Sequence, residues 1–127
     1  STTPAELATE IAATGCDGLI AGHCGIPFAC QVGSGIWINA GAIGMPADDG
    51  TPRIWFAVLT LGEAGLGVEI LPLEYDHAAA AAAMRAAGLP EGYAAALGSG
   101  IWPSCDVLPP AERARRGEKL MPAGLVW

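Results

Sequence analysis

Residues 18–46 read GLIAGHCGIPFACQVGSGIWINAGAIGMP and decide the fold more than any other part of the chain. The apolar run Gly18–Ala21 predicts a strand, which ends at the small residues of the sequence GHCG at positions 22–25. A strand end followed by small residues is where a protein of helices and strands commonly presents site groups. The stretch also holds one of the two histidines, two of the four cysteines and seven of the glycines, so a functional site is expected there.

The remainder of the chain alternates further strands with helices. Strands rich in β-branched and aromatic residues are predicted at 28–32, 36–38, 53–61 and 65–73. Helices are predicted from Pro4 to the stop at Gly15 and at 77–87, 91–97 and 111–119. The pattern predicts an α/β (α+β) fold with three parts, namely a helix with strands (1–75), an Ala-rich helical segment (76–98) and a proline-rich C-terminal arm with a short helix (99–127).

Composition narrows the classes of function. A formal charge of -7 leaves few cations for phosphate contacts, so nucleic acid binding is not expected. No run is long and apolar enough to span a membrane, and no signal peptide is recognised, which predicts a cytoplasmic protein. Hydrophobic residues make up 52% and charged residues 15% of the chain, so part of the apolar surface is expected to face a protein partner.

The four cysteines form no CxxC pair, which excludes a zinc ribbon or a thioredoxin-type motif. Cys16, Cys30 and Cys105 are interpreted as packing residues, because free cysteine is among the most buried residue types. Cys24 differs because it follows His23. Cys24 and Cys30 can approach one another if their strands pair, but a disulfide is not expected in a reducing cytosol.

Three other features have a structural and a functional interpretation. The sequence Asp48-Asp49-Gly50 is interpreted as a solvated turn in preference to a cation site. His77, in the first turn of its helix, is interpreted as a surface histidine because it has no companion at ligand spacing. In the proline-rich arm, the apolar residues Trp102, Val107 and Leu108 are expected to be buried against the rest of the chain.

Several motifs occur in the order of a known family. They are Gly22-His23, Ile-Pro-Phe at 26–28, Asn-Ala-Gly-Ala-Ile-Gly at 39–44, the Asp-Gly turn at 49–50 and the strands that follow. In this order the chain resembles the C-terminal half of the calcineurin-like metallophosphoesterases, over residues 5–73. The resemblance implies an α/β/β/α sandwich with a dinuclear site of divalent ions (Mn, Fe or Zn), in which a metal-activated water attacks a phosphoester.

The resemblance also implies roles for particular residues. His23 stands at the first histidine of the family's Gly-His-x-His motif, which binds one metal, whereas the second histidine is replaced by Gly25. The family's remaining ligands come from Asp-x-His, Gly-Asp-x-x-Asp and Asn-His motifs of an N-terminal half, and this sequence contains none of them. Asn39 is expected to tie backbone groups at the turn after its strand.

Cys24 has three interpretations. A thiolate is a good ligand for zinc and softer metals, so Cys24 is the second candidate metal ligand after His23. Because neighbouring residues of a regular strand point to opposite faces, joint binding by both residues requires an irregular backbone, which Gly22 and Gly25 permit. A nucleophilic role is less favoured because only His23 is near enough in sequence to act as a base, and a redox-linked site remains a further alternative.

The sequence thus predicts part of a metal-dependent phosphoester hydrolase whose site is completed by an N-terminal half or a partner chain. The substrate is a small phosphoester, and no substrate-binding or catalytic residue is assigned. The alternative is a catalytically silent subunit that acts in protein–protein binding.

Overall fold

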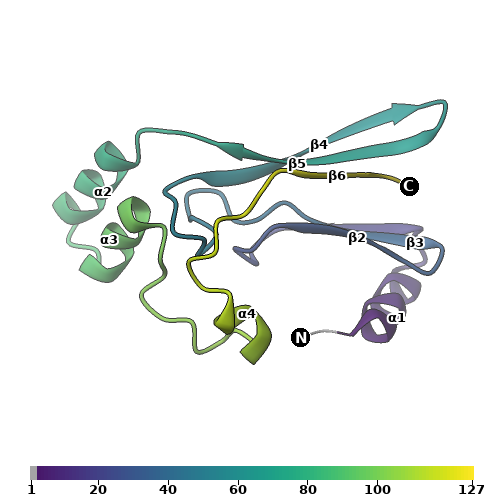
Figure 1. Ribbon diagram of the computed structural model, residues 1–127, viewed down its shortest axis with the longest axis horizontal. Helices are drawn as coiled ribbons and strands as arrows, with labels where there is room; N and C mark the ends of the chain where they lie inside the picture. The colour runs from purple at the N-terminus through teal and green to yellow at the C-terminus, as the bar shows by residue number, and fades with distance from the viewer. Residues whose placement is uncertain (1–2) are drawn as a thin grey trace.

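The computed structural model describes residues 3–127 (Figure 1). Two small sheets and the helices around them account for the described chain. In chain order the elements are α1 (Pro4–Thr14), β1 (Gly18–Ala21), β2 (Phe28–Val32), β3 (Gly35–Asn39), β4 (Ile54–Gly62), β5 (Gly65–Leu73), α2 (His77–Ala86), α3 (Glu91–Ser99), α4 (Pro110–Ala114) and β6 (Ala123–Val126). The predicted α+β class is confirmed.

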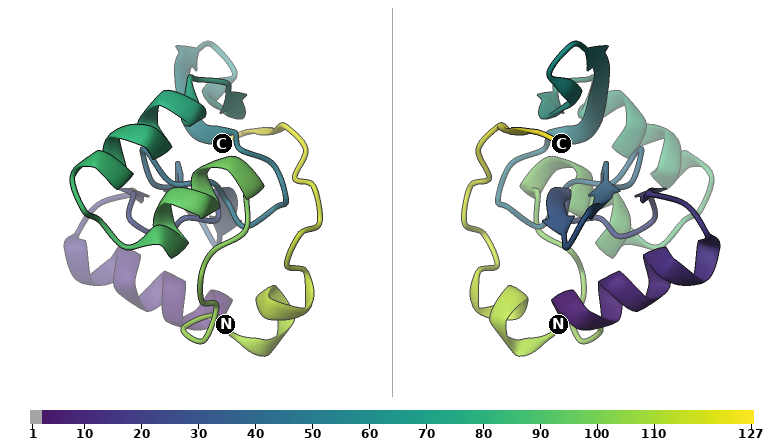
Figure 2. Two further views of the ribbon diagram at one scale, coloured as in Figure 1. Left: turned by 90° about the vertical axis from the view of Figure 1, so that its left-hand side faces the viewer. Right: turned by 90° about the vertical axis from the view of Figure 1, so that its right-hand side faces the viewer.

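The two sheets lie face to face, with α1 on the outer side of the first sheet (Figures 1 and 2). In the first sheet β3 is central, parallel to β1 and antiparallel to β2. In the second sheet β5 is central and antiparallel to both β4 and β6. Helices α2 and α3 lie together at one end of the sheets, so the described residues form the layers helix, sheet and sheet.

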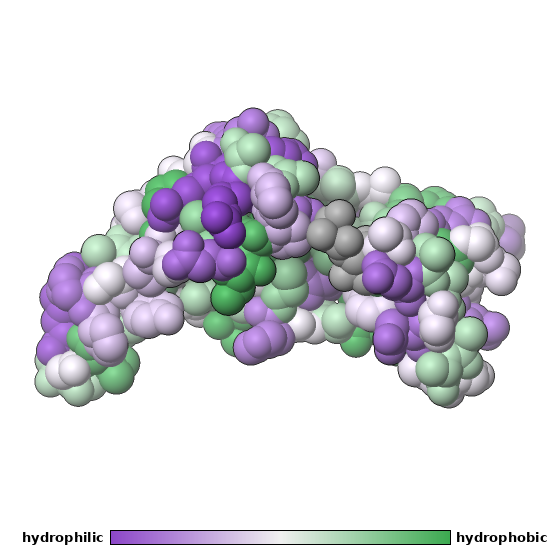
Figure 3. Space-filling view, turned by 90° about the horizontal axis from the view of Figure 1, so that it is seen from below, coloured by the Kyte–Doolittle hydropathy of each residue, from purple (hydrophilic) through white to green (hydrophobic). Residues whose placement is uncertain are grey.

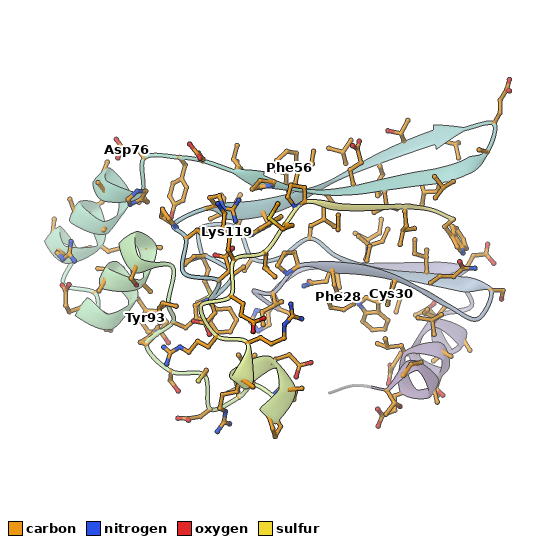
Figure 4. All side chains as sticks on the ribbon, viewed as in Figure 1. Phe28, Cys30, Phe56, Asp76, Tyr93 and Lys119 are labelled. Carbon is orange, nitrogen blue, oxygen red and sulfur yellow. The ribbon has the colours of Figure 1, made fainter. Side chains whose placement is uncertain are left out.

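The core lies between the sheets because each sheet turns its most apolar side chains inward. Ile36 and Ile38 of β3 belong to one buried cluster with Val68 and Ile70 of β5 and with Trp55 of β4. Burying an aliphatic side chain of this size contributes about 1.5–3 kcal/mol. The opposite face of the second sheet is less covered, and Phe56 of β4 is 37% exposed there (Figure 4).

The helix starts agree with their sequence signals. Thr3 caps α1 in a capping box with Glu6, and Gly15 ends the helix with a left-handed φ of 68°. The carboxylate of Asp76 accepts a hydrogen bond from the backbone N–H of Ala79 at the start of α2. These boundaries therefore agree with local sequence signals.

The C-terminal arm differs from its prediction. Helix α4 ends at Ala114, five residues short of the predicted Lys119, because Gly117 takes a φ of 80° and donates its N–H to the Asp48 carbonyl. The residues after α4 run back to the second sheet, where β6 pairs with β5. In Figure 3 the hydrophilic cluster lies over α4 and the residues that follow it.

Two burial predictions were wrong. Of the three apolar residues of the arm that were expected to be buried, only Trp102 is fully buried. Val107 is 89% exposed. Cys16 is exposed on the turn after α1, where its N–H and thiol bond to Thr14 and not to the core. No helix among residues 3–127 is long and apolar enough to cross a lipid bilayer.

Candidate functional site

The candidate site is the loop of residues 22–27, which leaves the end of β1. The Cys24 N–H donates a hydrogen bond of 2.9 Å to the Gly22 carbonyl, which closes a three-residue turn with His23 at its centre. His23 has a φ of 74°. This is the γ-turn of positive central φ, a rare and strained conformation for a residue with a side chain. The turn supplies the irregular backbone that joint use of His23 and Cys24 requires.

Asn39, the last residue of β3, binds the loop through its side-chain amide. Its side-chain amide donates to the carbonyls of Cys24 at 2.9 Å and Ile26 at 2.7 Å, and the residue is 1% exposed. Two hydrogen bonds made in a buried place fix the loop against the first sheet. Asn39 thus ties backbone groups as expected, but these groups belong to the loop of residues 22–27 and not to the turn that follows β3.

Trp102 of the C-terminal arm packs against the same loop at Gly25. A Cβ atom added to Gly25 would overlap the six-membered ring of Trp102. The indole N–H donates to the Pro46 carbonyl at 2.6 Å, and the Trp102 backbone N–H donates to Asp48 Oδ1 at 2.6 Å. The sequence predicted that Trp102 lies in an arm across a surface. It did not predict the contact with Gly25, because no sequence pattern joins positions 25 and 102.

The loop leaves the side chains of His23 and Cys24 exposed to solvent. Among residues 3–127, the one hydrogen bond of the Cys24 thiol is to the Ile26 carbonyl, at 3.9 Å. No three His, Cys, Asp or Glu side chains among residues 3–127 lie close enough together to hold a metal ion. Two donors do not make a divalent-ion site, so the residues of this chain do not by themselves fit the metals that the resemblance implies.

The other candidate ligands lie elsewhere. Cys30 stands on β2, where partial burial raises the pKa of its thiol and so disfavours the thiolate (Figure 4). His77 begins α2 and lies edge-on to Tyr75, with 6.2 Å between the ring centroids. Neither residue joins His23 and Cys24 in a group of ligands within the part of the chain that the structure describes.

The interpretation of Asp48-Asp49-Gly50 as a solvated turn was wrong. Asp48 is 3% and Asp49 2% exposed. Both oxygens of Asp49 are used, Oδ1 by the Thr51 N–H and hydroxyl and Oδ2 by Arg53 and the Leu120 N–H, at 2.7–3.1 Å. A carboxylate can be buried when a cation and several donors satisfy it. Asp49 is therefore a structural link between β4 and the arm.

Asp48 accepts hydrogen bonds on one oxygen only from residues 3–127. Its φ is 57°, and its Oδ1 accepts from the Trp102 N–H and lies 3.5 Å from the Arg116 guanidinium. Its Oδ2 is buried and has no hydrogen-bond partner within that range. Asp48 lines a cavity of about 40 Å³ that is shared with Arg116 and with Glu112, whose Oε2 is also buried without a partner. The cavity is large enough for about one water molecule.

Comparison with known proteins supports the resemblance drawn from the sequence. No protein-family model and no curated protein matches the chain. Among solved structures, the crystal structure of a metallophosphoesterase from Sphaerobacter thermophilus is similar, with 28% sequence identity and a TM-score of 0.63 over 80% of this chain. The match covers 50% of that protein, so the chain corresponds to half of its length. The fold is that of a metallophosphoesterase-like fragment.

Proposed function

We propose that this chain is part of a metal-dependent phosphoester hydrolase. In this proposal His23, with Cys24 second, contributes to a divalent-metal site that an N-terminal half or a partner chain completes. The substrate is a small phosphoester.

The observation that carries the proposal is the strained turn at His23. A γ-turn with a histidine at positive φ costs about 1–3 kcal/mol, and it persists only where surrounding contacts impose it. Here the hydrogen bonds of Asn39 and the packing of Trp102 hold the loop while the imidazole stays exposed. Strained backbone that presents an unused donor is common at functional sites. The similarity to a metallophosphoesterase gives this donor a chemical context.

The incomplete donor set supports the need for a second segment. This chain offers one imidazole and one thiol at the loop, whereas a metal that acts on a phosphoester needs further protein ligands. Strand β1 is paired on one side only within the described residues, and Ile20 at its middle is 68% exposed. The end of β1 therefore has open space beside it for residues from elsewhere.

Metal binding and hydrolysis test the proposal together. The chain is purified with its upstream or co-purifying polypeptide, its metal content is measured, and hydrolysis of bis(4-nitrophenyl) phosphate is followed. His23→Ala is expected to lower metal affinity at least about tenfold, since even partners of metal ligands matter by 10–100-fold. His77→Ala is the matched control, because it removes the other histidine of the sequence. If no metal is bound and no substrate is hydrolysed, with and without the second polypeptide, the proposed hydrolase activity is refuted.

Cobalt substitution separates the two donors. If Cys24 binds metal as a thiolate, the cobalt-loaded protein shows a sulfur-to-metal charge-transfer band that Cys24→Ser abolishes. Cys16→Ser is the control, since Cys16 is likewise exposed. An identical spectrum in both variants would remove Cys24 from the site and leave His23 as its ligand.

A second candidate function is a catalytically silent subunit that binds a protein partner. Its support is the number of large apolar side chains at the surface, such as Ile43 at 94% and Leu61 at 86% exposure. For a silent subunit, Ile20→Asp is expected to abolish assembly with the second polypeptide, while His23→Ala changes no measured property of the assembly. Loss of hydrolysis in His23→Ala would exclude the silent subunit.

A further inference from the structure

The two sheets are joined along one side of the sandwich and left open along the other. The strands of both sheets run along the same axis in Figure 1. At the joined side β2 lies beside β6, and the Trp127 indole N–H donates to the Ser34 carbonyl at 3.0 Å. The opposite edge strands, β1 of the first sheet and β4 of the second, therefore lie together at the other side. No strand of residues 3–127 pairs with the outer edge of either.

The hydrophobic core is incomplete at this open side. Ile20 of β1 is the register partner of Ile38 of β3, so both side chains lie on the face that is turned toward the second sheet. Ile38 is 1% exposed, but Ile20 is 68% exposed. In the second sheet Leu59 of β4 is the register partner of Val68 of β5, and their exposures are 39% and 1%. Both edge strands thus carry apolar side chains on the core face that residues 3–127 do not fully cover.

Strand β4 also lacks the features that protect a natural edge strand. Its residues 54–62 read IWFAVLTLG, without a charged residue or a proline. Natural edge strands are usually short, charged, bulged or covered, because their open row of N–H and C=O groups otherwise pairs with other chains. In contrast, β4 spans nine residues and pairs with β5 without a break in register. Its outer edge is therefore suited to accept a further strand.

The comparison with the similar metallophosphoesterase indicates where such strands come from. This chain corresponds to 50% of that protein, so half of that protein lies outside the match. A second copy of this chain is a less suitable occupant of the open side. Each copy carries a formal charge of -7, and charge of one sign keeps copies of a protein apart.

We propose that the open side is the docking surface for the half of a metallophosphoesterase-like protein that this chain does not cover, and that this half adds one strand beside β1 and one beside β4. The inference rests on the proposed function, which takes the remaining site residues from that half. The added strands turn apolar side chains toward Ile20 and Leu59 and so complete the core. Because the loop of residues 22–27 follows β1, the strand beside β1 also brings residues of the second half close to His23.

Hydrogen exchange followed by mass spectrometry tests the docking surface. The chain is measured alone and with its upstream or co-purifying polypeptide, at short labelling times, when local opening dominates exchange. The outward-pointing amides of residues 18–21 and 54–62 are expected to exchange at least about tenfold more slowly in the assembly, because the new strands bond them. Residues 123–126 are the internal control, since β6 lies at the joined side and should change by less than about twofold.

A charge placed at the open side gives a second measurement. Ile20→Asp is expected to weaken binding of the second polypeptide at least about tenfold, because docking would bury an unpaired carboxylate. Val126→Asp is the matched control, since Val126 is 63% exposed and belongs to β6 at the joined side. It should change the affinity by less than about twofold. Equal weakening by the two variants would overturn the proposal.

Failure of the docking surface can be told apart from failure of the hydrolase. An assembly that hydrolyses bis(4-nitrophenyl) phosphate but leaves residues 18–21 or 54–62 exchanging as in the chain alone would overturn the docking surface only. An assembly that protects both strands without metal or turnover would support the docking surface and refute the hydrolase. The docking surface is also overturned if no second polypeptide binds, or if light scattering shows that the chain alone forms a dimer in which residues 54–62 are protected.

Discussion

Two loops contain side chains of similar chemistry but differ in how the fold treats them. They are the loop of residues 22–27 and the loop of residues 46–53. Both contain groups that bind metals in other proteins, and each contains a residue at positive φ, His23 at 74° and Asp48 at 57°. In the second loop the carboxylates are buried and bonded to the arm and to β4. In the first loop the imidazole and the thiol face solvent.

The difference shows which observation separates a site from a scaffold. Positive φ does not, because both loops have it. Hydrogen bonding by the side chain does separate them. Both oxygens of Asp49 accept hydrogen bonds from the protein, whereas neither ring nitrogen of His23 bonds to any of the described residues. A polar group that is both unused by the fold and exposed is available to a ligand, whereas the unpaired Asp48 Oδ2 of the second loop is buried.

Removing the Asp49 carboxylate should have the largest effect. Asp49→Ala leaves the Arg53 guanidinium without its anionic partner and the Leu120 N–H without its acceptor, so it is expected to lower the free energy of unfolding by about 3–5 kcal/mol. Chemical denaturation followed by tryptophan fluorescence measures this. His23→Ala, in the other loop, should change stability by no more than about 0.5 kcal/mol in either direction. Equal effects would abolish the distinction between the loops.

The contact between Gly25 and Trp102 should give the next largest effect. Gly25→Ala overpacks the indole and is expected to destabilise by about 1–3 kcal/mol. In a Trp102→Phe background, where the overlapping part of the indole is absent, the same alanine should cost about 1 kcal/mol less. Simple additivity in this double-mutant cycle would mean that the arm does not hold the loop.

Relief of backbone strain should give a smaller effect, of opposite sign in the two loops. His23→Gly removes a strained side chain that makes no contact needed for folding, so it should raise stability by about 1 kcal/mol while lowering metal affinity. Asp48→Gly relieves the same kind of strain but loses the hydrogen bond to Trp102, so it should lower stability. The two unfolding free energies, measured side by side, would contradict this account if they moved in the same direction.

The smallest effect is expected at Glu6, whose carboxylate is fully exposed but accepts hydrogen bonds that cap α1. Hydrogen bonds from the Thr3 backbone and hydroxyl lower the pKa of Glu6 below its ordinary value of 4.5. Because the folded pKa is lowered, the capping box stabilises α1 above pH 4.5, and this contribution is lost as the pH falls through the folded pKa. An NMR titration should show the low pKa, and Thr3→Ala should return it toward 4.5.

Most of the fold could be predicted because its signals are local. The capping residues Thr3 and Asp76, the glycine stop at Gly15 and the β-branched strands each depend on neighbours in sequence. The loop that carries His23 and Cys24 was also predicted, from an apolar run that ends in small residues. The resemblance to the metallophosphoesterases then agreed with the similarity found between the structures.

The contacts between distant segments could not be predicted. The Asp-Asp-Gly sequence has the composition of a turn, and only Trp102, Arg116 and Leu120, more than fifty positions away, turn it into a buried anchor. A pocket beside the start of α2, lined by residues 51–53, Glu74, Tyr75, His77 and Lys119, is likewise formed by segments that no sequence motif connects. Periodicity reports how a residue relates to its own element, whereas these sites depend on how elements meet.

The end of the described chain has a consequence for how the protein is made. Trp127 exchanges two backbone hydrogen bonds with Leu66, and its indole N–H donates across 93 positions to the Ser34 carbonyl. The β4–β5 hairpin can form as soon as it leaves the ribosome, but β6 and its ties to both sheets must wait until residue 127 has emerged. Because contacts of such long sequence separation form late, the second sheet should acquire its full protection against hydrogen exchange only after residue 127 has left the ribosome.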